Sequence, residues 1–143
     1  MNIYEKLKRF YKISIIPAII FFIFTQFYPL KILSKIKLPD YINLLFILIS
    51  IAFALIFPIL FRIIIFFHVN SKGAMSEGRF IIFEKVLILI SQISIYIMII
   101  AHYFLESQFV MIVLSVIAFY SLFYYYPTEK KINFDRRIFM LIK

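Results

Sequence analysis

The feature that most constrains this chain is an uncharged apolar run, Val86–Ala101, which apolar residues extend at both ends. The hydrocarbon core of a bilayer is about 30 Å thick, and an α-helix needs about 20 apolar residues to cross it. With Phe80–Phe83 before it and Tyr103–Leu105 after it, the run reaches that length. Ser76 is a residue type that caps helix starts. The sequence therefore predicts a transmembrane helix over about residues 80–104.

The composition places the whole chain in the same class. Hydrophobic residues make up 64% of its 143 residues, and only 16% are charged. A soluble domain of this size has too little interior to bury that much apolar surface. Within lipid, a helix satisfies its own backbone hydrogen bonds. We therefore expect an all-α integral membrane protein, of a bacterial inner membrane or an organelle inner membrane.

Three further apolar segments predict three further spans, over about residues 13–28, 44–67 and 109–126. The second segment is longer than the hydrocarbon core requires, so it must tilt, kink or extend into the head groups. Pro58 removes a backbone hydrogen bond and is the expected kink point. The first segment has an alternative interpretation as a signal peptide, but it ends without a small-residue cleavage pattern. Four transmembrane helices are the prediction, with residues 30–39 as an interfacial connector.

Residues 1–12 form a basic amphipathic arm in this interpretation. Ile3, Leu7 and Phe10 share one helical face, and basic residues occupy the others. Such an arm is typical of a segment that lies on anionic lipid head groups. A nucleic-acid partner is not expected, because the basic surface is too small.

The distribution of basic residues predicts the orientation. Most of the 16 Lys and Arg residues fall in the arm, around the connector between the second and third spans, and in the tail, residues 127–143. The connector after the first span holds only Lys31, Lys35 and Lys37. Cytoplasmic segments carry the excess of basic residues. Both termini are therefore predicted on the cytoplasmic or matrix side.

Arg62 and Glu84 are the sharpest structural prediction. Each is flanked by strongly apolar sequence, and each lies at the same separation from Gly73 in the connector between the second and third spans. In an antiparallel hairpin the two side chains would stand at the same depth. A charge left alone in such a setting costs several kcal/mol. We therefore predict an Arg62–Glu84 ion pair. The alternative is that both side chains extend separately to water, with Lys85 or Arg79 as the partner of Glu84.

Polar residues within the third span form a candidate intramembrane polar face: Ser91, Gln92, Ser94 and His102. One interpretation is hydrogen bonding between helices, or from serine to its own helix. The other is the lining of a substrate pathway. Pathways usually show an intramembrane charge or helices broken at the midplane, and neither is present, so the first interpretation is favoured.

No catalytic, cofactor-binding or metal-binding set is predicted. The chain has no Cys, which excludes disulfides, thiolate metal sites and Cys nucleophiles. Its two histidines, His68 and His102, fall at opposite ends of neighbouring spans and cannot share a metal. A Ser–His–acid triad built on His102 and Glu106 lacks the sharp GxSxG turn that exposes a nucleophile. We expect no enzyme activity from the chain alone.

Two classes of function fit these observations. The first is a structural or accessory subunit of a larger integral-membrane assembly, bound to other membrane subunits through Arg136, Arg137 and Phe139 in the tail. The second is a small homo-oligomeric transporter, channel or lipid-handling protein that uses the polar face of the third span. The second requires those polar residues to face one another across a symmetry axis.

Overall fold

A computed structural model describes residues 2–27 and 39–139 of the chain. Within these ranges the secondary structure is helical and includes no strand, as the sequence predicts. The elements are α1 (Ile3–Phe27), α2 (Asp40–Ile51), the short π-helix η1 (Ala52–Ile56), α3 (Phe57–Lys72), α4 (Glu77–Phe104), α5 (Gln108–Tyr124) and α6 (Glu129–Phe139).

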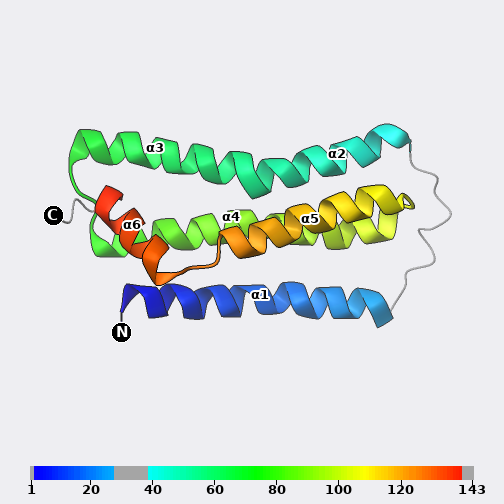
Figure 1. The fold of residues 1–143 in the computed structure, drawn as a ribbon, viewed down its shortest axis with the longest axis horizontal. Helices are drawn as coiled ribbons and strands as arrows, with labels where there is room; N and C mark the ends of the chain where they lie inside the picture. The colour runs from blue at the N-terminus through cyan, green and yellow to red at the C-terminus, as the bar shows by residue number, and fades with distance from the viewer. Residues whose placement is uncertain (1, 28–38, 140–143) are drawn as a thin grey trace.

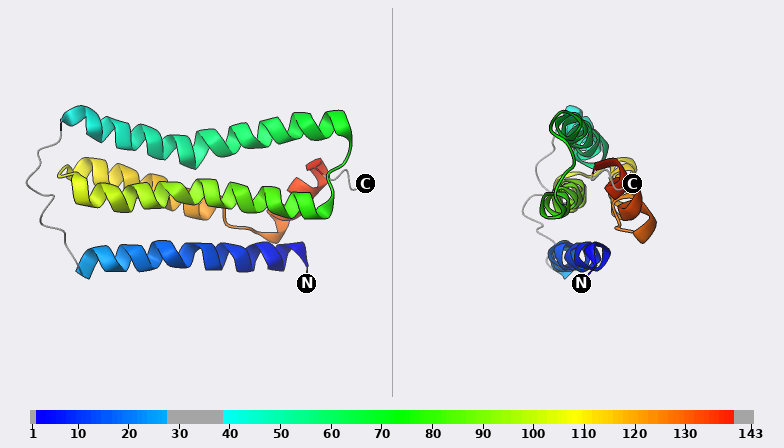
Figure 2. Two further views of the ribbon diagram at one scale, coloured as in Figure 1. Left: turned by 180° about the vertical axis from the view of Figure 1, so that it is seen from behind. Right: turned by 90° about the vertical axis from the view of Figure 1, so that its left-hand side faces the viewer.

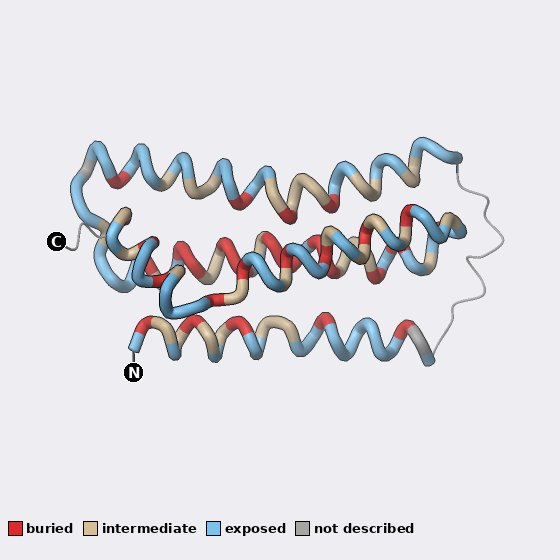
Figure 3. The backbone as a smooth tube through the Cα atoms, in the orientation of Figure 1, coloured by how far each residue is buried: buried red, intermediate tan, exposed pale blue. Residues whose placement is uncertain are grey.

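The long helices lie side by side, and α4 is the central one. It contacts α1, α2, η1, α3 and α5, with α1 on one side and the α2–η1–α3 rod on the other (Figures 1 and 2). The short helix α6 lies across the end of the bundle that holds the α3–α4 turn. Buried positions are concentrated along α4, whereas the α2–η1–α3 rod is mostly exposed (Figure 3). Because α4 contacts more helices than any other element, it carries half of the buried polar side chains among the described residues.

Two of the helical segments are long and apolar enough to cross a membrane. They are Asp40–Ser71 and Glu77–Phe104, and a third would be added if α5 and α6, which meet at a 72° bend, formed one broken span. Many large apolar side chains on α1, α2, α3 and α5 are exposed, which suits contact with lipid. The chain is therefore an all-helical protein with two to three candidate membrane spans among its described residues.

The α2–η1–α3 rod bends where the sequence predicts a kink. Pro58 is the second residue of α3, two positions after the end of η1, and it lacks the amide that an α-helix would bond to Ala54. A single π-turn is a common way to absorb such a break. The rod bends toward α4 at this point (Figure 1). Its 32 residues are roughly 48 Å long at the α-helical rise, so the rod exceeds the hydrocarbon thickness, as expected.

The first helix differs from the prediction. The basic arm and the first apolar segment form one continuous helix, α1, instead of an interfacial arm followed by a span. Ile3 and Leu7 are buried in a cluster with residues of α3, α4 and α6. The apolar face of the arm therefore packs on protein, where the sequence predicts contact with lipid.

The turns agree with the sequence in part. Gly73 adopts a φ of 90° at the end of α3, in the predicted loop. Ser76 stands at the start of α4, but its side chain makes no capping hydrogen bond. Ser107 caps α5 instead, by accepting from the amide of Val110 at 3.5 Å. Of the predicted connector 30–39, all but Pro39 lies outside the described residues.

Candidate functional site

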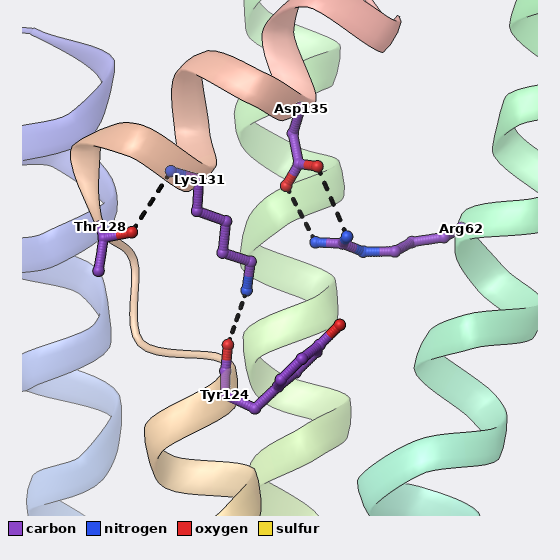
Figure 4. A network of polar contacts seen from close by, with 5 residues as sticks. All are labelled: Arg62, Tyr124, Thr128, Lys131 and Asp135. Atoms are coloured by element: carbon purple, nitrogen blue, oxygen red, sulfur yellow. Dashed lines mark hydrogen bonds and ion pairs between the residues drawn. The ribbon is translucent and has the colours of Figure 1, made fainter.

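Charged side chains from three helices meet at the end of the bundle that holds the α3–α4 turn. We call this set the charged junction: Arg62 of α3, Glu84 of α4, and Lys131 and Asp135 of α6. Arg62 donates to both carboxylate oxygens of Asp135, from Nη2 at 3.0 Å and from Nη1 at 3.5 Å (Figure 4). The side chain of Asp135 is only 2% exposed, and that of Arg62 is 24% exposed. Two parallel donors from one guanidinium fix the pair in distance and in orientation.

The predicted ion pair between Arg62 and Glu84 is not formed, because Arg62 pairs with Asp135. The prediction treated α3 and α4 as an isolated hairpin, whereas α6 brings a second carboxylate to the same point. Glu84 does lie at the expected depth. It is 3% exposed, and it interacts electrostatically with the Arg62–Asp135 pair and with Lys131. Its Oε1 atom is buried without a hydrogen-bond partner, so the junction holds one carboxylate that is incompletely satisfied.

Lys131 closes the junction toward α5. Its Nζ donates to the carbonyl oxygen of Tyr124 at 2.9 Å (Figure 4). The same atom lies 5.0 Å from the ring centroid of Tyr125. Burial lowers the pKa of Lys131, and the neighbouring Arg62 guanidinium lowers it further, while Glu84 and Asp135 raise it. An aromatic face and a carbonyl oxygen are favourable neighbours for a cation that has left water. The amide of Lys131 donates to Thr128 Oγ1 at 3.3 Å, which caps the start of α6.

Apolar contacts also hold α6 on the bundle. Ile132 and Phe139 are buried in the cluster that contains Leu7 and Phe83, and the amide of Met75 donates to the carbonyl oxygen of Phe139 at 3.0 Å. The sequence predicted Phe139 as a docking residue, but its side chain is buried and is not available to a partner. This amphipathic tail buries its apolar face within its own chain.

The other two predicted docking residues are placed differently from each other. Arg136 is half-buried, and its Nε has no hydrogen-bond partner. Arg137 is exposed. Of the three residues predicted for docking, only Arg137 faces fully outward.

Uncharged polar side chains form a second group, midway along the bundle. We call it the neutral cluster: Ser14, Ser91, Gln92, Ser94 and Ser121. Within α4, Ser91 donates to the carbonyl oxygen of Ile88, and Ser94 donates to that of Ser91, each at 2.8 Å. Ser121 of α5 donates to the carbonyl oxygen of Ser91. Gln92 Nε2 donates to Ser14 Oγ of α1 at 2.9 Å.

These contacts match the interpretation that the sequence favoured for the polar residues of the third span. Ser91 and Ser94 are 0% exposed and Gln92 is 3% exposed, so they join helices or bond to their own helix. His102 is exposed and does not join them. Sequence reasoning missed Ser14 and Ser121, although each is a serine within an apolar segment. That placement is a signal that could have identified both.

The two histidines do not converge with each other. His68 on α3 and His102 on α4 are both exposed, at opposite ends of the bundle. Within residues 2–27 and 39–139, no group of three or more His, Asp or Glu side chains is placed to hold a metal ion.

Comparison with protein families, with characterised proteins and with solved structures finds no significant match to this chain. Its function must therefore be inferred from the charged junction, the neutral cluster and the surfaces around them.

Proposed function

We propose that the chain is a structural or accessory subunit of a larger integral-membrane assembly, without chemistry of its own. The observation that carries this proposal is the position of α6. The partly buried Arg62–Asp135 ion pair helps to hold this amphipathic helix across the end of the bundle, so its outward side is presented as a surface of fixed orientation.

The outer face of α6 has the character of a docking surface. It comprises Lys130, Asn133, Phe134 and Arg137, all exposed. Phe134 is 61% exposed, and a cavity of about 610 Å³ lies beside it. Interface hot spots are enriched in aromatic residues and Arg, and charge complementarity sets partner choice. The expected partner is another membrane subunit that presents acidic and apolar side chains at the membrane surface.

In this proposal four helical segments cross the membrane, with both termini on the cytoplasmic or matrix side. Two of these segments are the candidate spans Asp40–Ser71 and Glu77–Phe104. The proposal adds α1 and α5 as the other two. The apolar half of α1 exposes large side chains from Ile13 to Phe27, and α5 has 17 residues without a charge. The basic residues of α1, of the α3–α4 turn and of α6 then share one side, as the positive-inside rule requires.

The alternative, a homo-oligomeric transporter or channel, draws less support. It needs the polar residues of α4 to face a symmetry axis, but Ser91, Gln92 and Ser94 are buried and hydrogen-bonded within a single chain.

Purification of the tagged full chain from native membranes in mild detergent, with mass determination of the complex, tests the proposal. We expect a second membrane protein in fixed stoichiometry. Phe134→Ala combined with Arg137→Ala should release it, whereas Arg9→Ala, an exposed Arg on α1, should not. A complex that contains only copies of this chain would contradict the proposal, and so would a partner retained by the α6 double variant.

Reporter fusions test the topology separately. Fusions after Lys72 and Lys143 should report the cytoplasmic side, and fusions after Lys37 and Glu106 the opposite side. A reporter after Lys72 that reads outside would overturn the four-span arrangement.

A further inference from the structure

An open groove lies between α3 and α4, next to the α3–α4 turn. Its volume is about 300 Å³, which is at the lower end of the range of about 300–1,000 Å³ for ligand pockets. The walls are apolar and the mouth is polar. The walls include Phe61, Ile65, Ile82, Phe83 and Val86, and the mouth includes His68 and Arg79.

The bend at η1 explains why this groove exists. The rod approaches α4 at η1, and α3 then runs at a distance from α4 toward the turn (Figures 1 and 2). Phe61 and Phe83 stack across the gap with ring centroids 5.6 Å apart, and Phe139 of α6 packs behind Phe83 at 4.9 Å. These rings close the inner side, while Ile82 is 62% exposed at the outer edge. The groove is therefore open toward the lipid-facing side of the bundle.

The mouth of the groove carries cationic character without an acidic partner. Arg79 is exposed, and the only ion pair among the described residues joins Arg62 to Asp135. Glu77 lies two positions before Arg79 but makes no ion pair with it. Arg79 and His68 both lie near the helix ends that flank the α3–α4 turn, at the level where the apolar walls end. An anion at the mouth and an apolar chain along the walls would complement this surface.

We infer that the α3–α4 groove binds one anionic phospholipid. The phosphate contacts Arg79, with His68 beside it, and an acyl chain runs between α3 and α4 past Ile82 and Ile65 toward Val86. Basic pockets between transmembrane helices are known to take anionic head groups. The groove holds part of one acyl chain, and the rest lies on the exposed apolar surface of the rod. This site is independent of the proposed docking function of α6.

The absence of Trp from the chain permits a direct test. An Ile82→Trp variant carries a single Trp at the edge of the groove. It is reconstituted in vesicles that mix phosphatidylglycerol and phosphatidylcholine, with bromine on the acyl chains of one lipid or the other. We expect brominated phosphatidylglycerol to quench this Trp with about a fivefold preference, the scale of one basic side chain acting on an anionic lipid. Val86→Trp serves as a second reporter.

Matched variants make the result specific. Ile112→Trp on α5 has the same exposure, 63% against 62% for Ile82, and should show equal quenching by the two lipids. Arg79→Gln should abolish the preference when it is added to the Ile82→Trp variant. Arg9→Gln, which removes the same charge from α1, should leave the preference of that variant unchanged.

Three results would overturn the inference. Equal quenching by both lipids at positions 82 and 86 would show that the groove does not select anionic lipid. A preference that survives Arg79→Gln would show that Arg79 does not contact the phosphate. Protection of both reporters from either lipid, with normal quenching of the Ile112→Trp variant, would show that protein covers the groove.

Discussion

The charged junction and the neutral cluster both gather around α4, but they are built in different ways. The junction joins α3, α4 and α6 at one end of the bundle, and its ion pair spans 73 positions of sequence. The neutral cluster joins α1, α4 and α5 midway along the bundle, and three of its hydroxyls bond to carbonyl groups of their own helix. A buried charge needs its partner, whereas a hydroxyl finds an acceptor locally.

This difference predicts how each cluster responds to mutation. Removing one charge from the junction leaves others buried and unpaired, so effects should be large and can take either sign. Removing a hydroxyl from the neutral cluster leaves the remaining groups bonded, so effects should be small. The following variants test the contrast, from the largest expected effect to the smallest, by SDS-driven unfolding of the full chain in detergent micelles.

Arg62→Met should have the largest effect. It leaves the carboxylates of Asp135 and Glu84 buried together, with Lys131 as the remaining cation of the junction. We expect a loss of about 3 kcal/mol in the free energy of unfolding. Arg79→Met, at an exposed Arg of the neighbouring helix, is the control and should change stability by less than about 0.5 kcal/mol. Equal effects of the two variants would show that Arg62 is not held in a buried pair.

Glu84→Gln should raise stability, by about 1 kcal/mol, because it removes a buried carboxylate oxygen that has no hydrogen-bond partner. It also removes the repulsion between Glu84 and Asp135. The isosteric change keeps the packing of α4. A loss of stability of similar size would mean that Glu84 is paired with a cation, as the sequence alone predicted.

Ser121→Ala should cost about 1 kcal/mol, the usual net value of one hydrogen bond. The carbonyl oxygen of Ser91 keeps a donor in Ser94, so no buried acceptor is left unpaired. Ser115→Ala is the matched control, since Ser115 bonds only within α5, to the carbonyl oxygen of Met111. If both variants have the same effect, the contact between α4 and α5 through Ser121 contributes nothing measurable.

Gln92→Leu should have the smallest effect, about 0.6 kcal/mol, the average for a hydrogen bond between transmembrane helices. Ser14 still donates to the carbonyl oxygen of Tyr11 at 3.0 Å, and leucine fills the same space. A loss above about 2 kcal/mol in the free energy of unfolding would be as large as the effects expected in the charged junction. It would contradict the proposed difference between the two clusters.

Local sequence patterns predicted the helices better than they predicted the partners of the polar side chains. The structure places α4 over Glu77–Phe104, close to the predicted 80–104, because an uninterrupted apolar run specifies a long helix. The position of the kink could likewise be predicted from one residue, Pro58. These features depend on neighbours in sequence.

The position of α6 depends on distant contacts and could not be predicted in the same way. The alternation of polar residues such as Asp135 with apolar residues such as Ile132 indicates an amphipathic tail. The sequence of the tail does not indicate that its apolar face packs on Leu7 and Phe83. Arg62 therefore had two candidate carboxylates, and only tertiary packing decides between them. The continuous helix α1 has the same origin, since its arm is held by the cluster that α6 completes.

The ion pair between Arg62 and Asp135 is the central contact of the charged junction, and it joins α6 to α3. Two double-mutant cycles measure this coupling most directly, Arg62→Met with Asp135→Asn and Arg62→Met with Glu84→Gln. The first cycle should give a favourable coupling energy of at least about 2 kcal/mol, because Arg62→Met leaves the buried Asp135 carboxylate unpaired and Asp135→Asn leaves the partly buried Arg62 guanidinium without its carboxylate. The second should give a smaller one. A larger coupling for Arg62 with Glu84, or a coupling below about 0.5 kcal/mol for Arg62 with Asp135, would contradict this assignment.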